Sequence, residues 1–277
     1  MNANSTIPSF PFSCPIRLRH LIREEFDQWS RQFMAHAFAS QNELGRLCDE
    51  AVYQNDIALR LEASGFGPVA KEVPLTISFR DFTKVYYLDL VVRESFIVEL
   101  KTVTTLLEEH DGQLLNYLFI AEAPHGKPVN LRPASVEYRT VNAVVVSRER
   151  RSFRLVIGRW QPHTGRCRDF LDLVKELFAA WGAFLDSRLY EEALIHLLGG
   201  KSNVLRRAPL TRAGSSLGTQ EVAHLTDTIG FRVTGLAPDA CAKYEAQHQR
   251  FLALTPLTTL HWLNLYHHHL ELVTVKR

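Results

Sequence analysis

Charged residues interrupt two apolar runs of the chain between Tyr86 and Lys101, in the stretch YYLDLVVRESFIVELK. Asp89 lies in the first run, and Glu99 and Lys101 lie in the second. The polar residues Arg93-Glu94-Ser95 separate the runs, and two apolar runs joined by a short polar turn predict a β-hairpin. Two carboxylates and a lysine are side chains that hold cations, move protons and stabilise negative charge, so this hairpin is a candidate site.

The register of the predicted hairpin brings these charges together. A three-residue loop pairs Val92 with Phe96, and counting back from that pair places Asp89 directly opposite Glu99. Side chains two apart on a strand share a face, so Lys101 joins the two carboxylates. Opposed like charges repel each other, and the rest of the hairpin is apolar, so the carboxylates need a cation. That cation is either Lys101 in an internal ion pair or a bound ion.

Helices before the hairpin carry further polar side chains. Aromatic and apolar residues spaced at three and four predict a helix from Leu21 to about Ser40. Asn42 is placed to cap a second helix that runs to about Ala63. Glu50 and Tyr53 stand three apart on this second helix, on a face next to its apolar stripe.

A third helix, expected from about Leu106 to Ala121, follows the hairpin. Gln113 and Tyr117 lie one turn apart on it and can point the same way. The rest of the first half is expected to be a polar loop at 124–139 and a strand pair made by Thr140–Val146 and Phe153–Ile157.

The second half of the chain repeats motifs of the first half. GRLCDEAVY at Gly45 matches GAFLDSRLY at Gly182 without a gap, and GQLLNYL around Gln113 is echoed by AQHQRFL around Gln247. Each half is then expected to end in an apolar strand pair, within 141–157 and 260–275. Several matches in the same order indicate an internal duplication.

The second copy lacks the charged pattern of the first. Ser187 stands where Glu50 would be, and the stretch HLTDTIGFRVTGL from His224 contains no Glu-x-Lys. Asp227 is the carboxylate of that stretch nearest to the position of Asp89. We therefore expect the second copy to be inert, and to pack against the first copy or shape a substrate groove.

The composition is that of a globular protein, with 46% hydrophobic and 22% charged residues. A net charge of +2 means that any nucleic-acid site must be a local patch. The cysteines are scattered without a CxxC pair, which disfavours a zinc site or a disulfide framework and leads us to expect a cytoplasmic protein. No nucleophilic serine or cysteine has an evident histidine partner in the sequence. No apolar stretch approaches the roughly 20 residues that span a membrane.

The first copy resembles the GxxExxY proteins, a branch of the PD-(D/E)XK nuclease superfamily. The matching motifs are ExxY at Glu50 and Tyr53, D…ExK at Asp89 and Glu99-Leu100-Lys101, and QxxxY at Gln113 and Tyr117. An ExK alone is common, whereas the ordered set, spanning about residues 43–157, is fairly specific. The chain departs from the family pattern at Arg46-Leu47-Cys48-Asp49, the residues between the glycine and the glutamate.

This resemblance implies an α/β fold, with a mixed sheet flanked by helices and a restriction-endonuclease-like core followed by a degenerate second copy. The domain boundaries that we expect are 1–30 for an N-terminal arm and the start of the first helix, 31–160 for the nuclease-like domain, and 161–277 for the degenerate repeat.

The resemblance also implies a role for each site residue. Mg²⁺ or Mn²⁺, which prefer carboxylate oxygen and water, would be held directly by Asp89 and Glu99. The backbone carbonyl of Leu100 and the carboxylate of Glu50 would complete the ligands. Lys101 would hold the attacking water or stabilise the transition state.

The remaining expected site residues surround this centre. Gln113 would orient water or a backbone phosphate, and Tyr53 and Tyr117 would line the site. The basic run that contains Arg148, Arg150 and Arg151 is a candidate grip on DNA phosphates, although such runs are often only solvated.

The implied activity is metal-dependent hydrolysis of phosphodiester bonds in DNA. The alternative is a catalytically inactive nuclease-like module that binds nucleic acid or a protein partner. DNA is the expected partner, a protein partner or a homodimer is compatible with the sequence, and no membrane association is expected.

Overall fold

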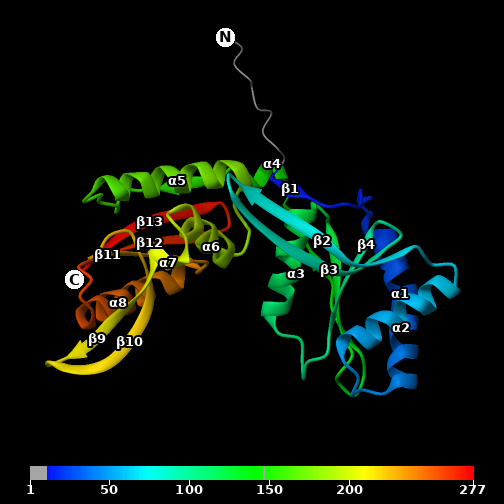
Figure 1. Ribbon diagram of the computed structural model, residues 1–277. Coiled ribbons are helices and arrows are strands. Elements are labelled where there is room, and N and C mark those ends of the chain that lie inside the picture. The colour runs from blue at the N-terminus through cyan, green and yellow to red at the C-terminus, as the bar shows by residue number, and fades with distance from the viewer. Residues whose placement is uncertain (1–10, 146) are drawn as a thin grey trace, which may run out of the picture. The chain divides into compact units, whose positions relative to one another are not determined.

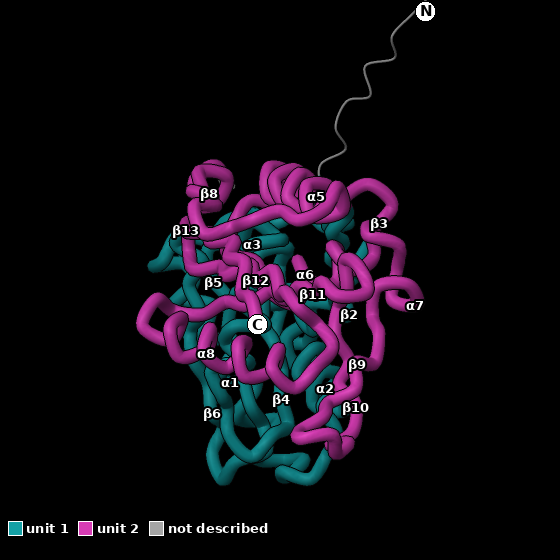
Figure 2. Tube along the Cα trace, turned by 90° about the vertical axis from the view of Figure 1, so that its left-hand side faces the viewer, with its two compact units in different colours: residues 1–78, 83–146 teal, residues 79–82, 147–277 magenta. Residues whose placement is uncertain are grey.

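The computed structural model describes residues 11–145 and 147–277 (Figure 1). The first ten residues of the expected N-terminal arm and Val146 lie outside this description. The chain forms two compact units, one within residues 1–78 and 83–146 and the other made of residues 79–82 and 147–277 (Figure 2). Each unit contains a mixed β-sheet with helices, so the chain is a mixed α/β protein.

The first unit contains seven strands and three helices among the described residues. In chain order they are β1 (Phe12–Ser13), α1 (Arg23–Leu44), α2 (Glu50–Ala63), β2 (Val69–Phe79), β3 (Phe82–Val92), β4 (Phe96–Lys101), α3 (Glu108–Ala121), β5 (His125–Asn130), β6 (Glu137–Tyr138) and β7 (Val141–Asn142).

The sheet of this unit has the order β1-β2-β3-β4-β5-β6, and β7 also pairs with β5. Strands β3 and β4 are antiparallel and β4 and β5 are parallel, with α3 as the crossover that a parallel pair requires. The predicted hairpin register is confirmed, because Val92 pairs with Phe96. Strand β4 is therefore a central strand, and it is buried except at Lys101.

The two faces of β4 meet different surroundings. Phe96, Val98 and Leu100 join the hydrophobic core that α1 and α2 form, in which the rings of Phe26 and Phe96 lie 5.0 Å apart. Because side chains alternate along a strand, the residues between them face the other side of the sheet. Glu99 and Lys101 belong to this second set.

Helix α1 is longer than the sequence predicted, and the expected cap at Asn42 is wrong. Asn42 lies inside α1, which ends at Gly45, and α2 begins only at Glu50. Gly45 has a φ of +76°, a conformation that a residue without a Cβ adopts at little cost, so the glycine ends the helix. The N-cap of α2 is Asp49.

The expected loop at 124–139 is also wrong, since it contains β5 and β6. Strand β5 has the sequence HGKPVN, and Pro128 pairs with Glu99 in the middle of the sheet. Proline and lysine are unusual in a central strand, which is why the pattern suggested a loop. The buried ammonium of Lys127 lies 4.4 Å from the ring centroid of Tyr138, which stabilises the charge there.

The second unit contains its own sheet and helices. In chain order they are α4 (Ser147–Arg150), β8 (Arg154–Val156), α5 (Gly165–Trp181), α6 (Ser187–Leu197), α7 (Lys201–Val204), β9 (Leu205–Arg212), β10 (Ser215–His224), β11 (Ile229–Thr234), α8 (Pro238–Leu254), β12 (Thr259–Tyr266) and β13 (His269–Lys276).

The sheet of the second unit has the order β8-β13-β12-β11-β10-β9. Strands β11 and β12 are parallel with α8 between them, and β9, β10 and β11 are successive antiparallel neighbours. The expected pairing of 140–146 with 153–157 is wrong, because β7 pairs with β5 and β8 pairs with β13. Near the end of the first unit, β5 instead pairs with both β6 and β7.

The two units share one succession of elements. Each has a pair of helices, three strands joined as antiparallel neighbours, a crossover helix, a parallel strand and an antiparallel strand that follows it. The hydroxyl of Tyr53 donates a hydrogen bond to the carbonyl of Gly45 at 2.6 Å, and Tyr190 donates to Gly182 at 2.5 Å. Gly45 ends α1 and Gly182 ends α5, each with a positive φ.

A second shared contact lies at the ends of the parallel strands. Asn130 accepts a hydrogen bond from the N–H of Val103 at 3.0 Å and donates to its carbonyl at 2.9 Å. Asn264 makes the same two bonds with Leu236, at 2.8 and 2.9 Å. Each asparagine thus fixes the chain directly after the preceding parallel strand.

Two general properties follow from the described residues. No helix in the described ranges is long and apolar enough to cross a membrane. The four cysteines are free thiols.

Candidate functional site

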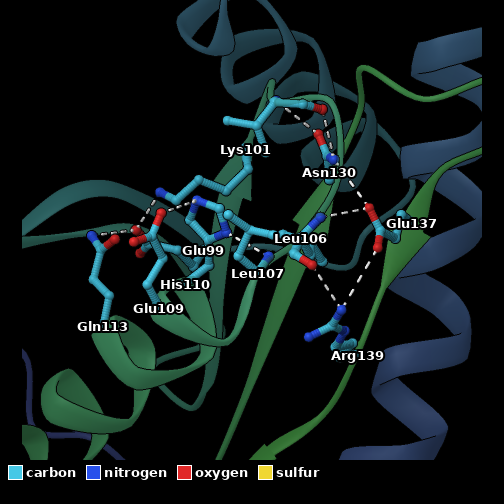
Figure 3. Close-up of polar contacts among 11 residues, drawn as sticks. Glu99, Lys101, Leu106, Leu107, Glu109, His110, Gln113, Asn130, Glu137 and Arg139 are labelled. Carbon is cyan, nitrogen blue, oxygen red and sulfur yellow. Dashed lines mark hydrogen bonds and ion pairs between the residues drawn. The ribbon is translucent and has the colours of Figure 1, made fainter.

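The carboxylate of Glu99 is the centre of the candidate site (Figure 3). Its side chain is 2% exposed, and the ammonium of Lys101, on the same face of β4, donates to Oε1 at 2.7 Å. The amide nitrogen of Gln113 donates to the same oxygen at 3.0 Å and also reaches the hydroxyl of Tyr117 at 2.8 Å. Residues from β4 and α3 therefore meet at one oxygen.

Asp89 reaches the same place from the neighbouring strand. The outermost pair in the register of β3 and β4 is Leu90 with Val98. The next residues outward are Asp89 on β3 and Glu99 on β4. The side chain of Asp89 accepts a hydrogen bond from the N–H of Leu100 at 2.7 Å. Asp89 is thus fixed beside the segment that separates Glu99 from Lys101.

Glu50 comes from the first turn of α2, where the positive end of the helix dipole favours a carboxylate. Its half-buried side chain is close enough to Lys101 for the two charges to interact, and it receives a backbone hydrogen bond from Thr102. Sequence reasoning missed Arg132, which fixes this region. The Arg132 guanidinium binds the carbonyls of Arg46 at 2.6 Å, Cys48 at 3.2 Å and Thr102 at 3.3 Å.

Three carboxyl groups and one ammonium meet at the site, and the carboxyl groups have raised pKa values. Burial, followed by repulsion from Asp89 and Glu50, raises the pKa of Glu99 to about 8. Burial also raises the pKa of Asp89 to about 6 and raises that of Glu50 above its usual range. Burial alone would lower the pKa of Lys101, but the carboxylates around it raise it. One ammonium does not neutralise these three carboxylates.

The loop between β4 and α3 is held by a separate network of polar contacts (Figure 3). Glu137 accepts hydrogen bonds from the N–H of Leu106 at 2.8 Å and from Asn130 at 3.2 Å. Arg139 donates to the carbonyl of Leu106 at 2.8 Å and forms an ion pair with Asp111. These contacts fix the start of α3 and hence the position of Gln113.

The charged cluster lies inside a segment with a known family. Residues 27–141 match the family model of the PD-(D/E)XK nuclease superfamily. The N-terminal half of the chain therefore holds a PD-(D/E)XK domain. Members of this superfamily are typically metal-dependent phosphodiesterases that act on nucleic acid. The motif residues from Glu50 to Tyr117 all lie in the matched range.

Other comparisons add little to this assignment. The crystal structure of SSO0001 is 21% identical over 44% of this chain and 62% of its own chain, with a TM-score of 0.26. The chain thus spans less than two thirds of that protein. No curated protein matches the chain.

The PD-(D/E)XK domain offers the donor atoms that a hard divalent cation prefers. The second carboxylate oxygen of Glu99, Oε2, is buried and has no hydrogen-bond partner. A buried anionic oxygen without a partner is costly unless a cation or donor satisfies it. In the ranges that the structure describes, no three His, Cys, Asp or Glu side chains converge as a ready metal cage. One oxygen of Glu99 accepts from Lys101, and one oxygen of Asp89 accepts from the N–H of Leu100. Carboxylate oxygens are the ligands that Mg²⁺ and Mn²⁺ prefer, so these residues fit such an ion.

Two residues that the sequence assigned to the site lie elsewhere. Tyr53 is fully buried in the core and bonds to Gly45, so it does not line the site. Arg150 is 1% exposed, and its backbone lies against Gly182, so its guanidinium is not available to a phosphate. Arg148 and Arg151 are exposed on the second unit. Tyr117 does lie beside Gln113, and its ring is 5.2 Å from that of Tyr86.

One cysteine does lie against a histidine in the fold, but neither residue is accessible. In the second unit, Nε2 of His261 lies 3.2 Å from the sulfur of Cys167, and its Nδ1 lies 3.2 Å from the hydroxyl of Thr274. Both Cys167 and His261 are 0% exposed, and burial lowers the pKa of His261 to about 4. A substrate cannot reach this pair, so it is part of the core.

Proposed function

We propose that the PD-(D/E)XK domain is a metal-dependent nuclease that hydrolyses phosphodiester bonds in DNA. The observation that carries this proposal is the buried carboxylate of Glu99, which has Lys101 and Gln113 on one oxygen and no partner on the other. The unpartnered Oε2 of Glu99 can accept a bound cation, because no protein group donates to it.

Asp89 and Glu99 are the direct ligands in this proposal, with the carbonyl of Leu100, and Glu50 adds a third carboxylate from the helix. Mg²⁺ or Mn²⁺, when bound, lowers the pKa of a bound water and screens the charge of the scissile phosphate. The hydrogen bond from Leu100 N–H to Asp89 supports this arrangement because it holds one ligand in place before any cation binds.

Lys101 orients the attacking water and stabilises the negative charge that develops on the phosphate oxygens. Its compact ammonium is half-buried and already lies at the site, so little reorganisation is needed. Gln113 positions water or a backbone phosphate, and its bond to Tyr117 fixes the orientation of its amide.

The internal ion pair is the rival explanation of this cluster. The contact between Lys101 and Glu99 exists, but a single positive charge faces Glu50, Asp89 and Glu99. An internal ion pair with Lys101 does not account for the second oxygen of Glu99, which is buried without a partner. The excess of negative charge supports a cation-binding role.

We also propose that residues 161–277, which lie within the second unit, are a degenerate copy of the nuclease-like domain of the first unit. The shared order of elements, the matching bonds of Tyr53 and Tyr190, and the matching bonds of Asn130 and Asn264 support this duplication.

The strand register supports the loss of chemistry in the second copy. Counting from the start of each parallel strand matches Glu99 with Arg232 and Lys101 with Thr234. Arg232 lines a cavity of about 450 Å³ in the second unit, together with Glu191 and Tyr244. A guanidinium in place of the central carboxylate cannot bind a metal ion.

Within the superfamily, we propose a relation to the GxxExxY proteins. The ExxY at Glu50 and Tyr53 supports it, whereas Gly45 stands further from Glu50 than the motif requires. The hydrogen bond from Tyr53 to Gly45 joins α2 to the end of α1 and so helps to position Glu50 at the start of α2. DNA is the proposed partner, and Arg148 and Arg151 remain candidates for contacts with its phosphates.

The test is cleavage of labelled single- and double-stranded DNA in Mg²⁺, in Mn²⁺ and in a chelator. Wild type is expected to cut only with metal, and Glu99→Ala and Lys101→Ala are expected to lose cutting. Arg232→Ala, at the matching position of the second unit, serves as the control and retains cutting. Equal cleavage by all four proteins, or no cleavage in either metal, would contradict the enzyme and leave a binding module.

A further inference from the structure

Glu72 on β2 is tied to the candidate site by a buried glutamine. The amide nitrogen of Gln54 donates to Oε1 of Glu72 at 2.6 Å and to the backbone carbonyl of Asp89 at 3.0 Å. Gln54 is 8% exposed and lies on α2, one turn after Glu50. One side chain therefore holds the exposed carboxylate of Glu72 next to the strand that carries Asp89.

The backbone of Glu72 is held in an unfavourable conformation. Its φ is +50°, in the left-handed region that residues with a Cβ rarely adopt. Glycine would occupy this position at a lower energetic cost. Glu72 keeps this uncommon conformation while its carboxylate is held by Gln54.

The charge of Glu72 adds to the imbalance at the site. Its carboxylate is a fourth acidic side chain near the site, since Gln54 bonds both to Glu72 and to the backbone of Asp89. The unpartnered buried oxygen of Glu99 independently points to cation binding at this cluster.

We propose that Glu72 is a further carboxylate of the divalent-cation site, which strengthens the binding of a hard cation such as Mn²⁺ by adding negative charge and acceptor oxygens beside Asp89 and Glu50. This inference rests on the proposed function, since it concerns the same site. The rival explanation is that Glu72 only fastens β2 to α2.

The chain supplies a matched control for that rival explanation. The neighbouring Lys71 donates from its ammonium to the side-chain oxygen of Asn55 at 2.6 Å. This contact also joins β2 to α2, but it brings no carboxylate to the site. A fastening role predicts similar effects from Lys71 and Glu72 variants, whereas a cation role separates them.

The test is calorimetric titration of the full chain with Mn²⁺, without DNA. Glu72→Gln removes the charge and keeps an acceptor for Gln54, and we expect the Kd for Mn²⁺ to rise roughly 10–100-fold. Lys71→Gln is expected to leave the Kd unchanged. Glu72→Gly is expected to raise the melting temperature in chelator, because it relieves the backbone strain, while it weakens Mn²⁺ binding.

Each outcome decides between the two proposals. An unchanged Kd in Glu72→Gln, with weaker binding in Glu99→Gln, overturns the role of Glu72 and leaves the proposed function standing. Absence of Mn²⁺ binding by wild type, or binding that neither Glu99→Gln nor Asp89→Asn weakens, overturns the proposed cation site and the role of Glu72 with it.

Discussion

The ammonium of Lys101 lies 2.7 Å from Oε1 of Glu99, while Oε2 of the same carboxylate is buried without a partner. Lys101 therefore donates to one oxygen of the Glu99 carboxylate and leaves the other without a donor. Site residues arranged for chemistry commonly reduce stability in this way, because their charges are not matched in the free protein. The variants below separate stability from activity at this pair.

Glu99→Gln is expected to raise stability and abolish cleavage. The substitution removes a buried charge that repels Asp89 and Glu50, and it keeps the shape of the side chain. We expect a melting temperature in chelator at about pH 8 that is roughly 2–4 °C higher, corresponding to about 1 kcal/mol. Thermal denaturation and DNA cleavage measured on one preparation check both parts. A variant that is less stable than wild type at that pH contradicts the account.

The pH dependence of stability follows from the same carboxylates. The pKa values of Glu99 and Asp89 are raised to about 8 and about 6, mainly by burial, from about 4 in an unfolded chain. A carboxyl whose pKa is raised in the fold stabilises the protein when protonated. That contribution is complete below about pH 4 and is lost as the pH rises through about 6 and about 8.

We therefore expect the free energy of unfolding in chelator to fall between about pH 5 and about pH 8. Urea denaturation of wild type and of a double variant, Asp89→Asn with Glu99→Gln, measures this slope, which should be shallower in the variant. Mn²⁺ favours the ionised carboxylates, so its stabilising effect should grow with pH. Identical slopes for the two proteins would show that these carboxyls do not have raised pKa values.

Tyr53→Phe and Tyr190→Phe are expected to destabilise their units by similar amounts. Each variant removes a hydroxyl that donates to a glycine carbonyl at a helix end. Loss of a buried hydrogen bond costs about 1–2 kcal/mol, which urea denaturation resolves. Tyr87→Phe is the control, because this ring is 52% exposed. Cleavage by folded Tyr53→Phe should equal that of wild type, and a large loss of cleavage would place Tyr53 in the chemistry after all.

A single chain is expected to cut one DNA strand at a time. The proposed ligands lie in the first unit, and Arg232 and Thr234 occupy the matching places in the second. Supercoiled plasmid in Mg²⁺ should therefore convert to open circles before linear molecules form. Direct conversion to linear plasmid would indicate two cooperating centres, as in a homodimer.

The hairpin that carries Asp89 and Glu99 could be predicted because its register depends on a local turn and on alternation. The contact of Gln113 with Tyr117 followed from one helical turn of spacing, whereas its contact with Glu99 depends on how α3 packs on β4. Strand β5 could not be predicted, because its Lys127 and Pro128 imitate a loop and only burial between neighbouring strands reveals it.

Arg132 and Glu72 were missed for a different reason. Arg132 binds the loop before α2 from more than 80 positions away in the sequence. No local sequence pattern predicts a contact over such a separation. In the sequence Glu72 stands before an apolar run, as an ordinary surface residue would, and its place in β2, its bond to Gln54 and its positive φ exist only in the fold. The pairing of β8 was similarly hidden, since its partner β13 lies near the far end of the chain.

The most direct test of the account is the cleavage rate of a labelled DNA duplex and single strand by wild type, Lys101→Met and Arg232→Ala in Mn²⁺. Lys101→Met removes the ammonium and keeps the length of the side chain, and we expect a loss of roughly 10²–10³-fold or more. Arg232→Ala should cut at the wild-type rate. A Lys101→Met protein that cuts as fast as wild type, or a wild type that cuts neither substrate, would contradict the assignment of this site as a nuclease centre.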